Sequence, residues 1–354
     1  MTRRPARRRQ GFVMPAVLTV VAVVTLVFLV VILSLDSLTE EARSAREDIR
    51  FREAALTAEA EVAWLMSTEP LSEQAIAIGR RRASLEETYG SGVADLGVPT
   101  AELRLDGRPY RLPDGPIPGT ALTVQVQDGG GLANLNTLDP IQARRFFEVL
   151  GLPQSEAARF ADRLTDYLDA DDFRQPSGAE IDDYVREGAG RPQNGGLSRV
   201  EEISGLLGFH EAVERGRFRA LRDHLTADPT TFAFNINTMT PEAMVILFGA
   251  APERAVAAAE RRAAGPFTTF AEFAAVAGVP DTSSYEVSTT FPTGRVALKA
   301  LDRRRGIAYR SRITVSPSDR EKPVWVEDRS FTPMTAAERR TEPADAEPFP
   351  VAAP

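Results

Sequence analysis

The residues best suited to chemistry form a run of carboxylates between positions 166 and 183, where six Asp and one Glu fall within 18 residues. Charges of one sign at this density repel one another unless water or a cation offsets them. Calcium fits such a run, because Ca²⁺ takes about six to eight oxygen ligands. The run lacks the glycine and final Glu of an EF-hand loop, and the alternative interpretation is a solvated acidic loop and helix face. We expect calcium here, and the candidate ligands are Asp166, Asp169, Asp171, Asp172, Glu180 and Asp183.

No other set of residues points to catalysis. The chain has no cysteine, and His210 and His224 are its only histidines, which argues against a zinc site or a histidine-based nucleophilic centre. There is no nucleophile–base pair and no phosphate loop in the sequence, so we predict that the protein is not an enzyme.

The net charge of −8 argues against nucleic-acid binding. Without cysteine, an exported chain must be stabilised by its core or by a metal.

The N-terminal region predicts a membrane anchor. Five arginines lie within the first ten residues, and residues 12–35 carry no charge. Twenty-four helical residues span about 36 Å, enough to cross a hydrocarbon core of about 30 Å. Because the arginines precede the span and acidic residues follow it, we expect a single-pass inner-membrane protein with a cytoplasmic N-terminus and a periplasmic main domain.

The junction between leader and span distinguishes three kinds of N-terminus. A secretory signal has a shorter apolar region and a small-residue cleavage site, which this run lacks. A plain anchor that is never processed remains possible. The third interpretation starts from Gly11 and Phe12, where a basic leader ends in glycine before an aromatic residue. This junction resembles the cleavage site of type IV prepilins, and the resemblance implies that prepilin peptidase cuts after Gly11 and that Phe12 is then N-methylated.

Around this anchor, the patterns predict an α+β protein with a helical insertion. A helical period continues from residue 36 to residue 66, and a short helix is expected over residues 71–87. Alternation predicts a hairpin over 102–112 around an Asp-Gly turn, a strand at 121–126, a second hairpin formed by 295–301 and 307–315, and a strand at 324–331. The last residues, 332–354, have little to bury and are expected to be a disordered tail.

The segment between the two groups of strands is helical and contains an internal repeat. Residues 134–137 read Asn-Leu-Asn-Thr and residues 235–238 read Asn-Ile-Asn-Thr, and Pro140 and Phe147 recur as Pro241 and Phe248 at the same offset of 101. We expect Asn and Thr to cap the helix that follows in each copy. The repeats extend over about 134–209 and 235–279, and the carboxylate run is an insertion in the first.

The second copy resembles a helix-hairpin-helix unit with its turn near Gly249. Such units can bind DNA phosphates through backbone amides and nearby cations, which here are Arg254, Arg261 and Arg262. This turn lacks the paired glycines of that motif, and Glu253 and Glu260 offset some of the positive charge. A module for protein contacts is therefore preferred, and a membrane-anchored DNA-binding protein of a DNA-uptake apparatus is the alternative function.

Several longer motifs resemble one family, protein K of type II secretion. They are "GLANLNTL", "DYLDADD", "PSGAEIDDY", "RPQNGGLSRVEEI" and "FNINTMTPEAM". The resemblance implies a pilin-like helix and sheet with an inserted α-helical domain, and calcium. Ala16 replaces the Glu that most pilins carry at the fifth position after the cut, as is typical of protein K. Tyr167 stands where the family often has Trp.

We therefore predict a minor pseudopilin that caps or initiates the tip of a periplasmic filament for the export of folded proteins. The fold class is α+β, with an N-terminal transmembrane and stalk helix packed on an antiparallel sheet and an inserted all-α domain of two helix-hairpin-helix-like repeats. The resemblance implies as partners the I-type, J-type and major pseudopilins, prepilin peptidase and the inner membrane; no nucleic acid is expected. The predicted segments are the leader (1–11), the span (12–35), the stalk and first sheet part (36–127), the insertion (128–280), the second sheet part (281–331) and the tail (332–354).

Overall fold

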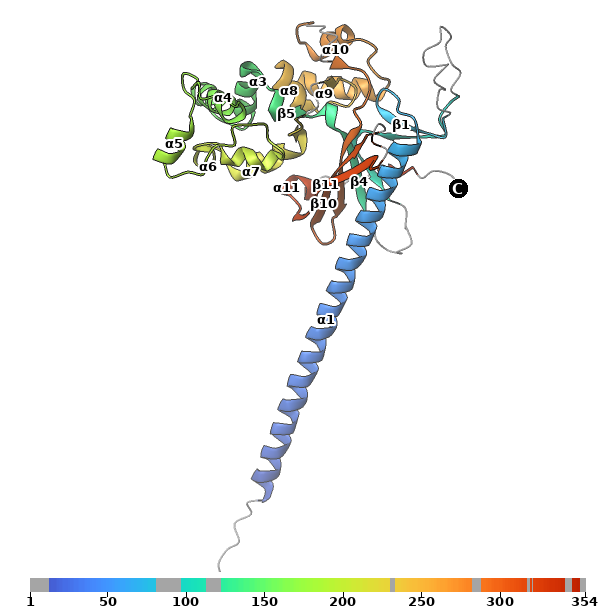
Figure 1. Ribbon diagram of the computed structural model, residues 1–354. Helices are drawn as coiled ribbons and strands as arrows, with labels where there is room; N and C mark the ends of the chain where they lie inside the picture. Colours follow the sequence, from blue (N-terminus) through green and yellow to red (C-terminus); the bar gives the residue numbers. More distant parts are fainter. Residues whose placement is uncertain are drawn as a thin grey trace, which may run out of the picture. The chain divides into compact units, whose positions relative to one another are not determined.

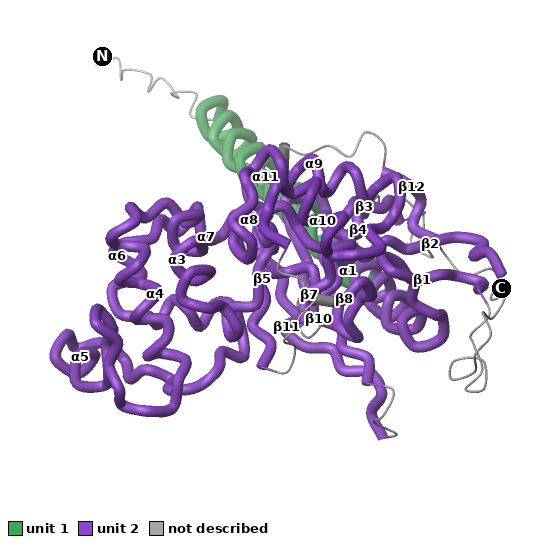
Figure 2. The backbone as a smooth tube through the Cα atoms, turned by 90° about the horizontal axis from the view of Figure 1, so that it is seen from above, with its two compact units in different colours: residues 1–53 green, residues 54–354 purple. Residues whose placement is uncertain are grey.

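A computed structural model describes residues 13–80, 97–112, 122–229, 233–281, 288–316, 319, 321–340 and 346–350. The chain divides into two compact units, Met1–Glu53 and Ala54–Pro354 (Figure 2). The predicted processing residues, Gly11 and Phe12, lie outside the described residues.

Helix α1 (Val13–Thr68) is continuous over 56 residues (Figure 1). Its first part is apolar and exposed, and α1 is the one helix among the described residues that is long and apolar enough to cross a membrane. The hydroxyls of Thr19, Thr25 and Ser34 donate to backbone carbonyls four residues earlier, at 2.8–2.9 Å. These bonds satisfy the polar groups of the apolar segment within the helix itself.

The main sheet has six strands in the order β11-β10-β9-β4-β3-β12. Its strands are β3 (Asp106–Arg111), β4 (Thr123–Asp128), β9 (Arg295–Asp302), β10 (Ile307–Val315), β11 (Val324–Pro333) and β12 (Glu347–Pro348). The predicted hairpin of β9 and β10 is present, with Asp302 opposite Ile307. The sheet is mixed and not wholly antiparallel, because β12 runs parallel to β3. The end of α1, from Ala54, packs on this sheet through its buried face.

Two local predictions differ from the structure. Residues 75–78, expected to be helical, form strand β1 (Ala75–Ile78), which is buried along its whole length and pairs with β2 (Ala101–Arg104). The predicted hairpin over 102–112 is absent, because β2 pairs with β1 while β3 pairs with β4. Asp106 and Gly107 belong to an irregular start of β3, where Gly107 has a φ of 76°. The two alternating runs are strands, as predicted, but each pairs with a different strand and not with the other.

The helical insertion holds one continuous apolar core built from both repeats. In the first repeat, α3 (Pro140–Val149) and α4 (Gln154–Leu168) are followed by α5 (Ile181–Arg186), the 3-10 helix η3 (Val200–Gly205), α6 (Phe209–Ala212), α7 (Arg215–Leu221) and the 3-10 helix η4 (Arg222–His224). In the second, α8 (Pro241–Phe248), α9 (Pro252–Ala263) and α10 (Phe270–Ala277) occupy the positions of α3, α4 and η3.

Short parallel bridges close both repeats in the same way. β5 (Ala133–Asn134) pairs with β6 (Leu225–Thr226), and β7 (Phe234–Asn235) pairs with β8 (Ser288–Thr289). The caps differ from the expectation: the side chains of Asp139 and Thr240 cap α3 and α8, whereas Asn134 caps only a short 3-10 turn, η2 (Leu135–Thr137). Polar caps are present, but in each repeat they lie two residues beyond the end of the Asn-Thr motif.

The C-terminal segment, expected to be disordered, is ordered where it is described. It contains the end of β11, helix α11 (Ala336–Arg340) and β12. Met334 is buried, and Phe349 is only 1% exposed and packs edge-on against Tyr110 with ring centroids 6.1 Å apart. One or two apolar residues in a polar segment are enough to fix it to a sheet edge.

Candidate functional site

The end of helix α1 has two apolar faces with different environments. One face, formed by Ala55, Ala58 and Val62, is fully buried against the sheet domain. The other carries Leu56 and Trp64, which are 42% and 50% exposed. An apolar face that remains open on a helix already packed on its own domain is typical of a contact surface for another protein.

A buried carboxylate fixes this part of α1 to the sheet. Glu59 accepts three hydrogen bonds from the Arg329 guanidinium, at 2.6, 3.1 and 3.3 Å, and one from the Tyr309 hydroxyl. Burial would raise the pKa of Glu59, but these hydrogen bonds outweigh it and leave the pKa below its usual value. Glu59 is therefore ionised in the folded protein and joins α1 to β10 and β11.

Asp128 organises the place where the insertion leaves and rejoins the sheet. It ends β4, it is fully buried, and its Oδ1 accepts from the backbone amide and hydroxyl of Thr293 at 2.9 and 2.7 Å. Its Oδ2 accepts from the Thr238 hydroxyl at 2.7 Å and from the Asn235 amide at 3.2 Å. One carboxylate therefore links the end of β4, the segment that leads into β9 and the start of the second repeat. Burial raises the pKa of Asp128 despite these donors.

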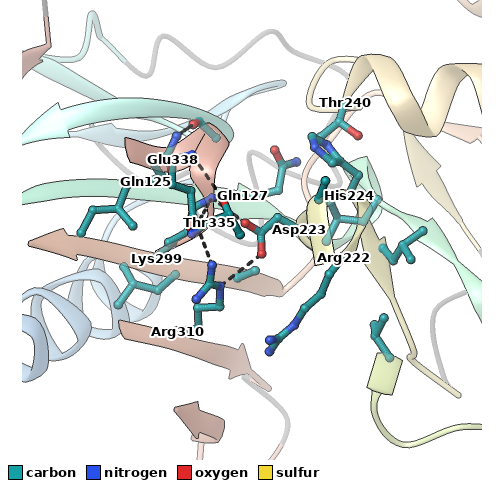
Figure 3. A pocket seen from close by; sticks show the side chains of 18 of the residues that line it. Gln125, Gln127, Arg222, Asp223, His224, Thr240, Lys299, Arg310, Thr335 and Glu338 are labelled. Atoms are coloured by element: carbon teal, nitrogen blue, oxygen red, sulfur yellow. Dashed lines mark hydrogen bonds and ion pairs between the residues drawn. The ribbon is translucent and has the colours of Figure 1, made fainter. Parts of the chain in front are cut away.

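Ion pairs form a second connection between the insertion and the sheet (Figure 3). Asp223, in η4, contacts Lys299 on β9 at 2.7 Å and Arg310 on β10 at 3.2 Å. Lys299 and Arg310 are direct cross-strand neighbours, so the acid offsets a repulsion between them. Glu338 of α11 contacts the same two cations at 3.5 and 2.6 Å.

The predicted calcium ligands are only partly brought together. Burial, and next the charges of Asp166, Asp169, Asp172 and Asp171, raise the pKa of Glu180, so all four aspartates act on it. Both carboxylate oxygens of Glu180 and one of Asp169 are buried without a hydrogen-bond partner. Asp183 instead pairs with Arg186 at 2.8 Å, and Asp171 and Asp172 are exposed. Among the described residues, no three acidic or histidine side chains converge closely enough to hold a metal ion as they stand.

Two of the three cations predicted near the helix-hairpin-helix turn have structural roles, and the third, Arg254, is exposed. Arg262 is 4% exposed and donates to the carbonyl of Met239, and Arg261 pairs with Glu272 and lies over the Phe267 ring. The turn itself is covered from the first repeat, where Arg145 donates to the carbonyl of Leu247 at 3.1 Å. These contacts favour the interpretation of the repeat as a packing module.

Sequence reasoning missed the residues that position the insertion and the stalk, Asp128 and Glu59. A partial signal exists for Asp128, which precedes three glycines at the point where the strand pattern ends. Glu59 has no such signal, because its partners Tyr309 and Arg329 lie 250 and 270 residues away in the chain.

Comparisons with known proteins agree on one family. The family profile "Type II secretion system (T2SS), protein K" matches residues 124–230. A type II secretion system protein K of Pseudomonas aeruginosa is 29% identical over 262 residues, which cover 70% of this chain and 71% of that protein. The protein of the same name from Dickeya chrysanthemi is 31% identical over 105 residues, 29% of this chain and 28% of that protein. A chain of the GspK-GspI-GspJ complex from enterotoxigenic Escherichia coli shares the fold, with a TM-score of 0.51, 18% identity, and coverage of 82% of this chain and 99% of that one.

Proposed function

The chain belongs to the protein K family of type II secretion, and from this we propose that it forms the tip of the periplasmic pseudopilus as a minor pseudopilin. Its role in the apparatus is structural and not enzymatic. The observation that carries the proposal is α1, which is apolar and exposed over its first part and is built into the sheet domain over its last turns. The helical insertion, which Asp128 links to the sheet, enlarges the sheet domain. We call the sheet domain with its insertion the head, and its size means that no further subunit is added above it.

The partners follow from the relative whose structure contains K, I and J chains together. We propose that this chain assembles with I-type and J-type minor pseudopilins and, below them, with the major pseudopilin. The open face of α1 at Leu56 and Trp64 is the surface proposed for these contacts. The N-terminus lies in the cytoplasm, the head lies in the periplasm, and prepilin peptidase cuts between Gly11 and Phe12.

Engineered disulfides test the docking face, because the chain has no cysteine of its own. Trp64→Cys, placed on the open face, should crosslink to an I-type or J-type partner that carries single cysteines along its stalk helix. Ala58→Cys on the buried face is the matched control and should give no adduct. Equal adducts from both positions, or none from Trp64→Cys when all the pseudopilins are present, would argue against this face.

Calcium remains a proposal for the acidic segment. It is supported by Glu180 and Asp169, whose buried oxygens lack partners, and by the raised pKa values of Asp166, Asp169 and Glu180, for each of which burial is the largest cause. A bound cation would supply the missing contacts, and these three residues would hold it.

The full chain, freed of metal with a chelator, should gain thermal stability on addition of Ca²⁺. Glu180→Gln should abolish the gain and Asp182→Asn, an exposed acid outside the ligand set, should preserve it; no gain in the wild type would refute the site.

A further inference from the structure

A cavity of about 420 Å³ lies between the helical insertion and the sheet (Figure 3). The insertion contributes residues of α7, η4 and the start of α8 to its wall, and the sheet side contributes residues of β3, β4, β9, β10 and α11. Its volume falls in the range of about 300–1,000 Å³ that small-molecule sites occupy. Neither the stalk contacts nor the acidic segment use this space.

The cavity wall contains more positive charge than its own acids offset. Its cations are Arg219, Arg222, Lys299, Arg303, Arg310 and Arg312, and its acids are Asp106, Glu201, Asp223, Asp328 and Glu338. Asp223 and Glu338 together neutralise Lys299 and Arg310. Glu201 pairs with Arg222 at 2.6 Å, and Asp328 pairs with Arg312 at 3.4 Å. The remaining acid, Asp106, is held at 2.9 Å by Arg108, which is not part of the wall.

Two guanidinium groups are therefore left without a carboxylate partner among the described residues, those of Arg219 and Arg303. Arg219 is exposed on α7, on the insertion side. Arg303 begins the turn between β9 and β10; its Nη1 donates to the carbonyl of Glu338 at 3.2 Å, while its Nε is buried without a hydrogen-bond partner. A buried N–H of a charged group without a partner is costly, and an anionic acceptor would satisfy it.

The rest of the wall combines aliphatic side chains with polar ones, which are Gln125, Gln127, His224, Thr240, Ser311 and Thr335. The aliphatic part includes Leu132, Val200, Leu225, Pro241, Leu298 and Leu301. Ligand sites commonly combine such apolar walls with a few polar groups that orient the ligand. The chemistry that matches this wall is an apolar body that ends in a single carboxylate.

We propose that this cavity binds an apolar carboxylate, with Arg219 and Arg303 pairing its charge and the aliphatic wall covering its body. Such a ligand contacts α7 of the insertion and the β9–β10 turn of the sheet at once. Its binding therefore stabilises the insertion on the sheet and adds to the contacts made by Asp128 and Asp223. This site is independent of the filament contacts of α1 and of the calcium site.

Isothermal titration of the full chain in detergent with 2-naphthoate, and with the uncharged 2-naphthamide, tests the proposal. The two probes share a ring system and differ in the carboxylate, and each is also titrated into micelles without protein, because the neutral probe partitions into detergent more strongly than the charged one. We expect saturable binding of 2-naphthoate at least about tenfold tighter than that of 2-naphthamide, because a charge-assisted hydrogen bond is strong. Arg303→Gln and Arg219→Gln should each weaken 2-naphthoate binding about tenfold and leave 2-naphthamide unchanged.

Two neighbouring arginines provide matched controls. Arg304→Gln changes the next residue of the turn and Arg215→Gln the first residue of α7, and neither residue belongs to the cavity wall. Both should bind 2-naphthoate as the wild type does. Arg219 is exposed, so its variant keeps the proposal testable if Arg303→Gln does not fold. Equal affinity for the two probes, no saturable binding of either, or full affinity in Arg219→Gln would overturn the proposal. The cavity would then be an empty space between the insertion and the sheet.

Discussion

Glu59 shows how one ionised side chain can hold the stalk to the head. Its pKa is lower in the folded protein than the ordinary value of 4.5, because the bonds from Arg329 and Tyr309 outweigh the effect of burial. A lowered pKa contributes stability that is complete above about pH 4.5 and is lost as the pH falls through the folded value. We expect Glu59→Gln to lower the free energy of unfolding by about 1–3 kcal/mol at neutral pH.

Chemical denaturation between pH 3 and pH 7 measures this contribution, and the loss of stability on acidification should be smaller in Glu59→Gln than in the wild type. Glu61 is the control two residues along the helix, because burial raises its pKa. Glu61→Gln should therefore make the loss on acidification steeper. If both variants show the wild-type dependence on pH, Glu59 is not the ionised link described here.

Asp128 is the second single residue that we expect to contribute strongly to the free energy of unfolding. In Asp128→Asn one carboxylate oxygen becomes an NH2 group, which faces donors and leaves at least one buried donor unsatisfied. We expect a loss of at least about 2 kcal/mol in the free energy of unfolding. Asp139→Asn, which exchanges one good helix cap for another on an exposed site, should cost little. A neutral effect of Asp128→Asn would mean that the insertion does not depend on this carboxylate.

The elements predicted correctly from sequence are those whose pattern is local. The long helix follows from an unbroken apolar run and a continued period, and the β9–β10 hairpin from two alternating runs around a short turn. Strand β1 was not predicted, because "AIAI" fits a buried helix or strand equally. The alternating run of β2 was predicted as a strand, but its pairing with β1 was not, because the sequence pointed to the run that follows it as the partner. The tail was misjudged because a polar segment needs only Phe349 and Met334 to dock it.

The same distinction applies to the candidate sites. The acidic segment and the repeat are visible as composition and self-similarity. The junction of the insertion depends on contacts over more than 100 residues, such as Thr238 with Asp128 and Thr293 with Asp128. A single sequence shows polar residues at these positions but not their pairing.

The repeats allow a direct comparison of equivalent elements. Asn136 binds the backbone of Leu197 through two hydrogen bonds of 2.8 Å, and Asn237 binds the backbone of Phe267 in the same way at 2.7 and 3.0 Å. Asn237 is fully buried, whereas Asn136 is partly exposed and water can replace its bonds. We expect Asn237→Ala to cost about 2–4 kcal/mol and Asn136→Ala about 1–2 kcal/mol.

Denaturation of the two variants measures these costs, and amide hydrogen exchange shows where each acts. Exchange should rise around residue 267 in Asn237→Ala and around residue 197 in Asn136→Ala. Equal costs would contradict the effect assigned here to burial, and exchange that rises in the other repeat would mean that each asparagine does not hold the residue that it contacts.

At the scale of the whole molecule, the two ends of the helical insertion lie close together, so the insertion can be removed and its ends joined. Thr293 donates to Asp128 from its amide and its hydroxyl, so residues 129–293 can be replaced by a short Gly-Ser linker, with Asp128→Ser to remove the exposed charge. We expect the anchored stalk and sheet to remain folded, as judged by a cooperative thermal transition, while export of folded proteins falls sharply. Secretion at the wild-type level would show that the insertion is not needed at the tip.

The central claim, that this chain is a processed pseudopilin, is tested most directly by its N-terminus. The intact mass and first residue should be determined for the protein extracted from membranes of cells with and without prepilin peptidase. We predict a chain that starts at N-methylated Phe12 in the first and an unprocessed chain in the second. A chain that starts at Met1 or Thr2 in both would contradict the claim and identify an ordinary anchored protein.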